Sequence, residues 1–400
     1  MNITKVLTYL IGFIPILLLL PTFLNWSYVF LLIILLSYKI KRQKNGIHSP
    51  IYNIIWSYII YITIINIYGF FIAENYWEFK ALIANICKYY SIIVVLWVSR
   101  YTNIYILYKK GFYIIFFSSI ICAAITNSYS FIYAMPFSFT LYILFYGINL
   151  KNKKTIAIIA TLFFCIITYY NMQRIDIIKL FFIIIIFIIG KKTYVNNLLL
   201  IKSFSILLII IPPIFLYTST NDIFNPFKMN EYIKGEYSTT RVENGNEINE
   251  DFKADTRTGI YVDIFKTLEE HNNWITGRTP AKGYKCLFIE TSDLYAGITE
   301  RSSSEVGILN ILLHYGIIGV VLYSCIIVYG IWLALYKSKN SYCKLLGLYM
   351  SFFFCISWIW QPPQISLFYI FDMCIIGLCY SPSFRSSTNK KIQQITQFYI

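Results

Sequence analysis

Long apolar runs separated by short polar connections make up most of this chain. Apolar runs of roughly 17 to 25 residues match the hydrocarbon thickness of a bilayer. Reading them as spans predicts twelve membrane helices, and eleven or thirteen remain alternatives because several runs are short or merge with a neighbour. The predicted spans are about 6–23, 26–40, 51–73, 81–99, 111–126, 130–149, 155–170, 173–190, 197–217, 306–334, 343–360 and 364–381.

The pattern predicts an all-α, polytopic membrane protein with one large loop. Residues 1–218 would form the first nine helices, 219–305 the loop, 306–381 the last three helices, and 382–400 a tail. Within the loop, apolar residues recur at helical spacing and predict an amphipathic helix. These residues are Ile260, Ile264, Phe265 and Leu268.

Clusters of cations recur in alternate connections, which indicates the orientation of the helices. Lys and Arg in short loops are retained on the cytoplasmic side during insertion. With twelve helices and both termini in the cytoplasm, every cluster falls on that side, and the loop 219–305 lies outside. The clusters are Lys39 to Lys44, Arg100 to Lys110, Lys151 to Lys154, Lys191 and Lys192, Lys337 and Lys339, and Arg385 to Lys391.

The charge distribution argues against a nucleic-acid-binding protein. The net charge is +15, yet 15 of the 19 acidic residues fall between Asp222 and Glu305, where they outnumber the cations. The excess cations therefore belong to the predicted cytoplasmic side, where they act as an insertion signal. No zinc-ligand spacing and no cofactor motif appears, so neither a metal nor a cofactor is predicted.

Ionisable residues in or beside the predicted spans are candidates for function. Arg174 opens the eighth span at its predicted outer end, where a guanidinium suits a lipid diphosphate. An interfacial anchor is the alternative interpretation, especially for Lys179 in the same segment. Lys88 and Asp372 lie within spans, and each is predicted to be a buried partner between helices.

The outer loop and the span after it supply further candidates. Arg257 begins the amphipathic segment, where backbone N–H groups at a helix start favour an anion, although a surface arginine is the simpler interpretation. Glu305 has two interpretations: a capping box with Ser302, or a catalytic carboxylate. His314, farther along the same predicted helix, is interpreted mainly as a packing residue and as a secondary candidate for a base.

The segment from Ser302 onward resembles the O-antigen ligase and polymerase superfamily of bacterial membrane glycosyltransferases. Ligases of that family show a His, a small polar residue, nine residues and then Gly-x-x-Gly. Here Glu305, Val306, nine residues and Gly316-Ile317-Ile318-Gly319 have that spacing, with Glu in place of His. Arg174 and Arg257 match the two arginines of the family, and Arg278 lies in a Gly-rich segment similar to one in its outer loop.

This resemblance covers about 170–325 and implies a GT-C-like, multi-pass protein of the bacterial cytoplasmic membrane. The Glu-for-His replacement favours an O-antigen polymerase, which joins undecaprenyl-diphosphate-linked repeat units by inverting, metal-independent transfer. Glu305 would then be the catalytic base, and Arg174, Arg257 and Arg278 would bind the lipid diphosphate. The implied partners are lipid-linked glycans, membrane lipids and, as a further candidate, a chain-length regulator protein. A ligase acting on lipid A core and a flippase or exporter remain alternatives.

Overall fold

The computed structural model describes residues 52–100, 198–220, 238–243, 246–251, 258–286, 300–360 and 367–392, together with 182, 185 and 186. Predictions that concern other residues, including Arg174 and Arg257, lie outside these ranges. The main helices are α4 (Asn53–Ile72), α5 (Tyr76–Tyr89), α6 (Ile93–Arg100), α11 (Leu198–Thr220), α13 (Thr258–Glu270), α15 (Gly307–Tyr336), α16 (Ser341–Ser357), α17 (Leu367–Tyr380) and the short α18 (Pro382–Ser386), and a 3-10 turn (Tyr90–Ile92) joins α5 to α6.

The protein is a multi-pass membrane protein with a helical fold. Four helical segments of the described ranges are long and apolar enough to cross a membrane: Asn53–Ile72, Tyr76–Arg100, Leu198–Phe215 and Gly307–Tyr336. They correspond to predicted spans 51–73, 81–99, 197–217 and 306–334. The helix that was predicted from residue 81 begins earlier, because the Asn75 side chain accepts a hydrogen bond from the Glu78 backbone N–H at 3.0 Å and caps it.

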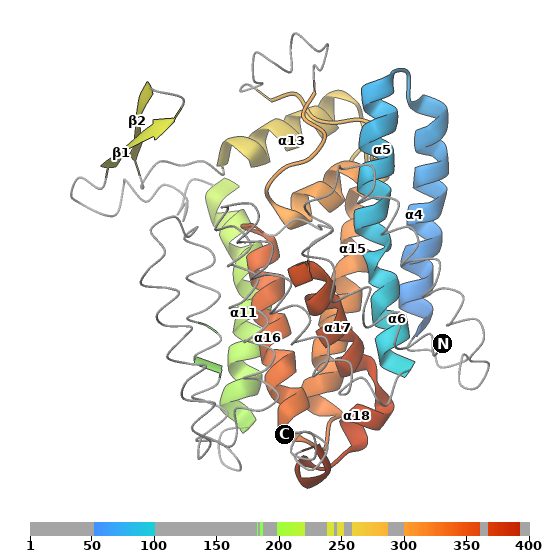
Figure 1. Ribbon diagram of the computed structural model, residues 1–400, viewed down its shortest axis with the longest axis vertical. Helices are drawn as coiled ribbons and strands as arrows, with labels where there is room; N and C mark the ends of the chain where they lie inside the picture. The colour runs from blue at the N-terminus through green and yellow to red at the C-terminus, as the bar shows by residue number, and fades with distance from the viewer. Residues whose placement is uncertain are drawn as a thin grey trace, which may run out of the picture.

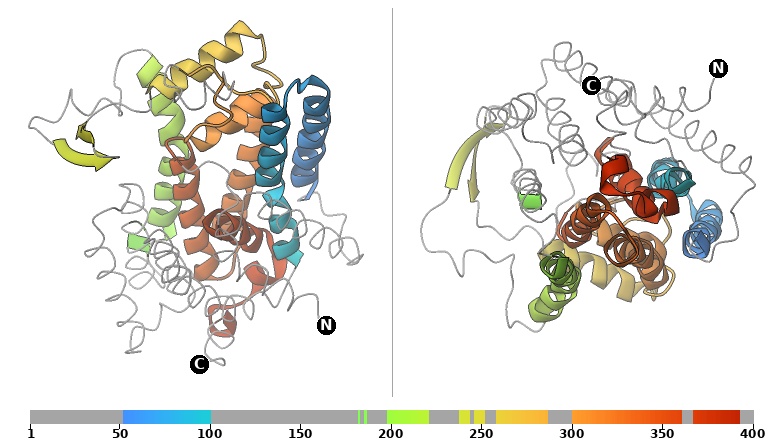
Figure 2. Two further views of the ribbon diagram at one scale, coloured as in Figure 1. Left: turned by 45° about the horizontal axis from the view of Figure 1, so that its top comes forward. Right: turned by 90° about the horizontal axis from the view of Figure 1, so that it is seen from below.

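The helices α15, α16 and α17 pack together at the centre of the described bundle (Figures 1 and 2). Helix α4 packs against α15, α6 against α17, and α11 against α16. Viewed from below in Figure 2, α4 and α11 lie on opposite sides of this centre. Exposed apolar side chains such as Ile64 and Phe71 on α4 and Leu199 on α11 are what lipid-facing helices require.

The two ends of the bundle differ in chemistry. One end, which we call the polar end, carries α13, residues 272–286 and residues 300–306 (Figure 1). At the other end, which we call the cationic end, the start of one helix lies beside the end of another: α4 beside α6, α11 beside α15, and α16 beside α18. There Arg100 lies over the Tyr52 ring at 5.3 Å, Lys202 over the Tyr336 ring at 4.3 Å, and Lys339 N–H donates to the Arg385 carbonyl at 2.8 Å. The described helices therefore alternate in direction as the cation clusters predicted.

A two-stranded ribbon departs from the all-α prediction. Strands β1 (Ser238–Glu243) and β2 (Asn246–Asp251) pair antiparallel within the predicted outer loop. Alternation in these strands is weak because most of their residues are polar, and a short charged hairpin therefore gives little periodic signal. The predicted amphipathic helix of the loop is confirmed as α13, which buries Tyr261, Ile264 and Leu268.

Candidate active site at the polar end of α15

Helix α15 is broken at Gly316, and the polar loop fills the break. The single span predicted for 306–334 is therefore wrong in one respect: residues 307–315 and 317–336 are two helices that meet at a residue with φ 65° and ψ −167°. A break at membrane depth exposes backbone groups that hydrocarbon cannot satisfy. Residues 274–279 supply the missing partners.

The partnership between loop and helix is reciprocal. The carbonyls of Leu313 and His314, at the end of the first half, accept from the N–H groups of Arg278 at 2.7 Å and Thr279 at 3.1 Å. At the start of the second half, the Ile317 N–H donates to the Trp274 carbonyl at 2.8 Å. The loop thus completes the hydrogen bonding of α15 on both sides of the break.

Two glycines make this approach feasible. Gly277 and Gly316 both adopt left-handed backbone conformations, with φ of 76° and 65°. A Cβ on Gly316 would lie 2.2 Å from the Ile275 carbonyl oxygen, and one on Gly277 would lie 2.4 Å from the His314 carbonyl carbon. Thr279, a β-branched residue, also has a positive φ of 67°, which is a strained conformation. The first glycine of the Gly-x-x-Gly motif is therefore the point where the loop docks.

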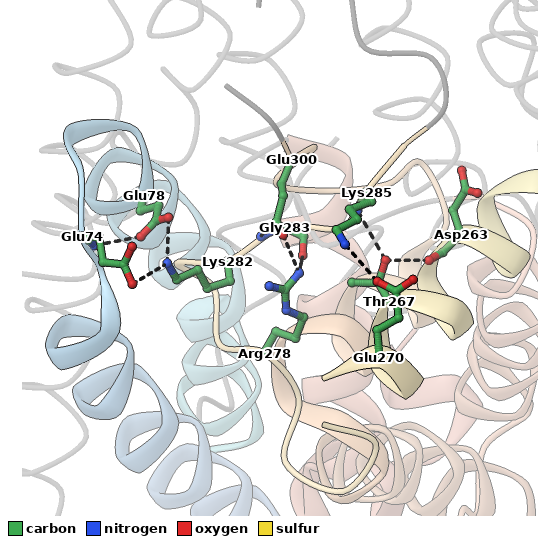
Figure 3. A network of polar contacts seen from close by, with 10 residues as sticks. All are labelled: Glu74, Glu78, Asp263, Thr267, Glu270, Arg278, Lys282, Gly283, Lys285 and Glu300. Carbon is green, nitrogen blue, oxygen red and sulfur yellow. Dashed lines mark hydrogen bonds and ion pairs between the residues drawn. The ribbon is translucent and has the colours of Figure 1, made fainter. Parts of the chain in front are cut away.

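Ion pairs tie the docked loop to neighbouring elements (Figure 3). Lys282 Nζ lies 2.8 Å from Glu78 Oε1 and 3.6 Å from Glu74 Oε1, which links the loop to the α4–α5 turn. Lys285 Nζ donates to Glu270 Oε2 at 3.0 Å, and this contact lowers the pKa of that carboxyl. These two lysines therefore bind the docked loop to α5 and to α13.

Arg278 is the buried member of this network. Its side chain is 8% exposed, and Nη1 donates to the Gly283 carbonyl at 2.5 Å and to Glu300 Oε1 at 2.9 Å (Figure 3). Glu300 also accepts from the Gly283 N–H at 3.0 Å. In this arrangement Arg278 closes the 278–283 turn onto residue 300. Its predicted contact with a lipid diphosphate stays a prediction.

The segment 302–306 lies outside the helix that it precedes. The capping-box interpretation of Ser302 and Glu305 is wrong, because Val306 occupies the N-cap position with extended backbone and the helix begins at Gly307. The reason is that the Asn310 side chain binds the backbone groups of Ser304, which a capping box would have left to the helix. The Asn310 amide accepts from the Ser304 N–H at 2.6 Å and donates to the Ser304 carbonyl at 2.7 Å, which holds this segment in a non-helical conformation.

Glu305 projects from this fixed segment towards the surface of the polar end. Its side chain is 40% exposed, whereas Ser304 and Val306 on either side are buried. Its Oε1 lies 3.7 Å from Nη2 of Arg301, which is 42% exposed. The carboxylate is accessible at the polar end and stands on a backbone held by Asn310, so a substrate hydroxyl could come within hydrogen-bond reach of it.

His314 is completely buried two residues before the break at Gly316. Its Nδ1 lies 2.7 Å from the Tyr89 hydroxyl, and its Nε2 lies 3.0 Å from the Ser302 carbonyl oxygen. Both ring nitrogens are therefore engaged within the protein, in agreement with the interpretation of His314 as a packing residue. The imidazole links α15 to α5 and to the segment that carries Glu305.

The start of α13 and the start of α15 meet at the turn after α16. The Tyr261 hydroxyl donates to the Trp358 carbonyl, and the Gly307 N–H donates to the Trp360 carbonyl at 3.3 Å. Arg257 immediately precedes α13 in the sequence, and Glu305 precedes α15 by two residues. Helices α13 and α15, which follow these two predicted site residues, therefore both contact the turn at residues 358–360.

Asp372 and Lys88, which were predicted to be buried partners between helices, differ in their contacts. Asp372 on α17 accepts from the Tyr349 hydroxyl on α16 at 2.8 Å, so its predicted role between helices is confirmed. Lys88 instead donates to Asn85 of its own helix at 2.8 Å, and Asn85 donates to the Pro280 carbonyl at 3.3 Å. Asn310 and Tyr89 were not predicted from the sequence. Asn310 is a polar residue within an apolar span, and such residues are candidates for a functional or structural role.

Comparison of the chain with protein-family models, with curated proteins and with solved structures finds no match.

Proposed function

We propose that this protein is a membrane glycosyltransferase of the O-antigen polymerase type, with a GT-C-like architecture. It would lengthen undecaprenyl-diphosphate-linked oligosaccharides at the outer face of the bacterial cytoplasmic membrane. The polar end would face outward and the cationic end would face the cytoplasm, in accordance with the distribution of positive charge.

The placement of Glu305 is the observation that best supports this proposal. The residue occupies the position that the family resemblance marks, on a backbone held by Asn310, and its carboxylate is partly exposed. The Gly316 end of the same motif is where the polar loop docks into α15. One end of the motif, Glu305, is thus an accessible carboxylate, and the other end, Gly316, is the residue against which the loop packs.

In the proposed reaction, a hydroxyl of the acceptor repeat unit attacks the anomeric carbon of the donor sugar. The bond from that carbon to the diphosphate oxygen breaks, and the diphosphate takes the electron pair. Glu305 accepts the hydroxyl proton and later passes it to water. Arg174 and Arg257 would stabilise the charge that develops on the departing lipid diphosphate.

Two other functions make different demands on the same structure. A ligase would use the same donor and a lipid A core acceptor, so it would share the Glu305 chemistry. A flippase or exporter would need polar groups along a path through the bundle. Among the described residues, ion pairs gather at the polar end, where Lys282, Arg278 and Lys285 hold the loop (Figure 3). That distribution favours transfer at the membrane surface.

Deletion of the gene, followed by analysis of the surface polysaccharide and of the lipid-linked pool, tests the proposal. A missing polymerase leaves surface molecules that carry a single repeat unit. Long lipid-linked glycans that never reach the lipid A core would instead indicate a ligase. Repeat units that stay on the cytoplasmic face would indicate a flippase. Unchanged polysaccharide length and amount would contradict all three functions.

A further inference from the structure

The Ser302 carbonyl is held by a histidine from the interior of the bundle. His314 is fully buried, and its Nε2 lies 3.0 Å from that carbonyl oxygen. A carbonyl can only accept, so Nε2 must carry the proton. In a neutral imidazole Nδ1 is then an acceptor, and the Tyr89 hydroxyl at 2.7 Å is its donor. The same hydroxyl also lies 3.2 Å from the Asn310 carbonyl oxygen, so its one proton has two acceptors, and the shorter contact, to Nδ1, orients the imidazole towards Ser302.

The other end of the same short segment is held by further contacts, and Tyr89 also donates to the carbonyl of one of the residues that make them, Asn310, at 3.2 Å. Asn310 binds both backbone groups of Ser304, and the Gly307 N–H donates to the Trp360 carbonyl. Glu305 lies between these anchors. The segment consequently has buried attachments before, within and after it, while the Glu305 side chain stays accessible.

We propose that His314, oriented by Tyr89, is a positioning residue that fixes the backbone carrying Glu305. This inference rests on the proposed function for its catalytic part, because Glu305 is the base only in that function. The anchoring itself rests on the contacts alone. His314 does not touch substrate in this role, since both of its ring nitrogens are bound within the protein.

Loss of the Ser302 contact should change both the mobility of the segment and the rate of transfer. His314→Phe fills the site with an apolar ring and removes both hydrogen bonds. His314→Gln keeps an N–H that can reach the Ser302 carbonyl. Since displacement of a catalytic group by about 1 Å can cost roughly a hundredfold in rate, we expect kcat to fall roughly tenfold to a hundredfold in His314→Phe with KM little changed.

A control for the loss of a buried hydrogen bond is available in the second half of α15. Tyr323 is buried, and its hydroxyl lies 3.0 Å from the Tyr369 hydroxyl, away from the 302–306 segment. Tyr323→Phe therefore removes a buried hydrogen bond of α15 without touching an anchor of Glu305. Tyr89→Phe removes the donor to Nδ1 and should reduce kcat less than His314→Phe does.

The experiment combines hydrogen exchange of peptides covering 300–307 with kinetics on undecaprenyl-diphosphate-linked oligosaccharide from a strain lacking the gene. The proposal expects exchange to be roughly tenfold faster and kcat lower in His314→Phe, with both values near wild type in His314→Gln and Tyr323→Phe. It is overturned if Tyr323→Phe behaves like His314→Phe, if His314→Gln fails to restore either value, or if His314→Phe exchanges like wild type. A wild-type protein that transfers no sugar overturns the proposed function instead, while the exchange data still decide whether His314 anchors the segment.

Discussion

At the scale of single residues, the polar end contains two kinds of charged side chain. Arg278 is buried and its Nη1 donates to Gly283 and Glu300, whereas Glu305 is accessible beside Arg301. The buried ion pair is sensitive to removal of one partner, because the other charge is left without compensation. The exposed pair contributes at most about 1 kcal/mol. Substitution at the two sites should therefore separate stability from activity.

Glu305→Gln should abolish transfer while the protein remains folded. The amide cannot take a proton from the acceptor hydroxyl, so we expect a loss of roughly a hundredfold or more in transfer rate. Stability should fall by at most about 1 kcal/mol, because the ion pair with Arg301 is exposed to solvent. Polysaccharide length on gels, measured with protein abundance in a strain that lacks the native gene, checks both expectations. Long chains at normal abundance would remove Glu305 from the mechanism.

Arg278→Ala should destabilise the polar end by about 3 kcal/mol, because Glu300 loses its partner in a largely buried site. If this role is structural, Glu300→Gln should be harmful as well, and the double variant should be less destabilised than the sum of the two. Thermal unfolding in detergent gives the three stabilities. A stable Arg278→Ala variant that has lost transfer would instead support the predicted contact with the lipid diphosphate.

At the scale of elements, the sequence predicts the helices far better than their irregularities. Apolar runs predict α4, α11, α15 and α16 because lipid demands long uninterrupted apolar segments. Such a run shows no change of period at Gly316, so the break in α15 could not be inferred from hydropathy. The break depends on loop carbonyls about forty residues earlier, from Trp274 and Ile275. Long-range backbone pairing of this kind leaves no local pattern.

For the candidate site, as for the helices, the sequence predicted some residues and could not predict the long-range contacts between them. Motif spacing singled out Glu305 and Gly316, and the structure gives both a defined place at the polar end. The hydrogen bonds of His314 with Tyr89 and Ser302 join residues far apart in the sequence, so no spacing could reveal them. Arg174 and Arg257 stay predictions.

Gly316→Ala tests the docking of the loop into the α15 break. Alanine disfavours the positive φ, and its Cβ would collide with the Ile275 carbonyl, so we expect a loss of roughly 2 kcal/mol or more. Gly259→Ala is the matched control, because Gly259 lies in α13 with no atom within 4 Å of its Cβ position. That change should be neutral or stabilising by up to about 1 kcal/mol. Equal melting temperatures of the two variants would argue against the docked loop.

At the scale of the whole molecule, the two ends of the described bundle differ in charge, and the proposed orientation rests on that difference. Arg100 is the last residue of α6, and Lys337 and Lys339 follow α15, so these cations lie at the cationic end, while α13 and the docked loop cover the other end (Figure 1). Among the described residues, the acidic side chains of Glu270, Glu300 and Glu305 thus lie at the opposite end of the bundle from these cations. This asymmetry is what the insertion of a multi-pass protein with an outer loop requires.

A reporter enzyme that works only outside the cytoplasm should be active when fused near Asn246 and inactive when fused near Lys153. The expectation follows from the position of Asn246 in the loop ribbon and from the cation cluster that contains Lys153. A second reporter that works only in the cytoplasm, fused at the same sites, should give the opposite pattern. An active outside reporter at Lys153 together with an inactive one at Asn246 would reverse the orientation and exclude transfer on the outer face.

We propose that this protein joins lipid-linked repeat units by itself. The most direct measurement is reconstitution of the purified protein in vesicles with undecaprenyl-diphosphate-linked oligosaccharide, followed by mass analysis of the products. We predict glycans of two or more repeat units on the lipid, and one free undecaprenyl diphosphate for every new glycosidic bond, with Glu305→Gln inactive in the same vesicles. A folded wild-type protein that leaves the oligosaccharide unextended, or only moves it across the membrane, would contradict the account.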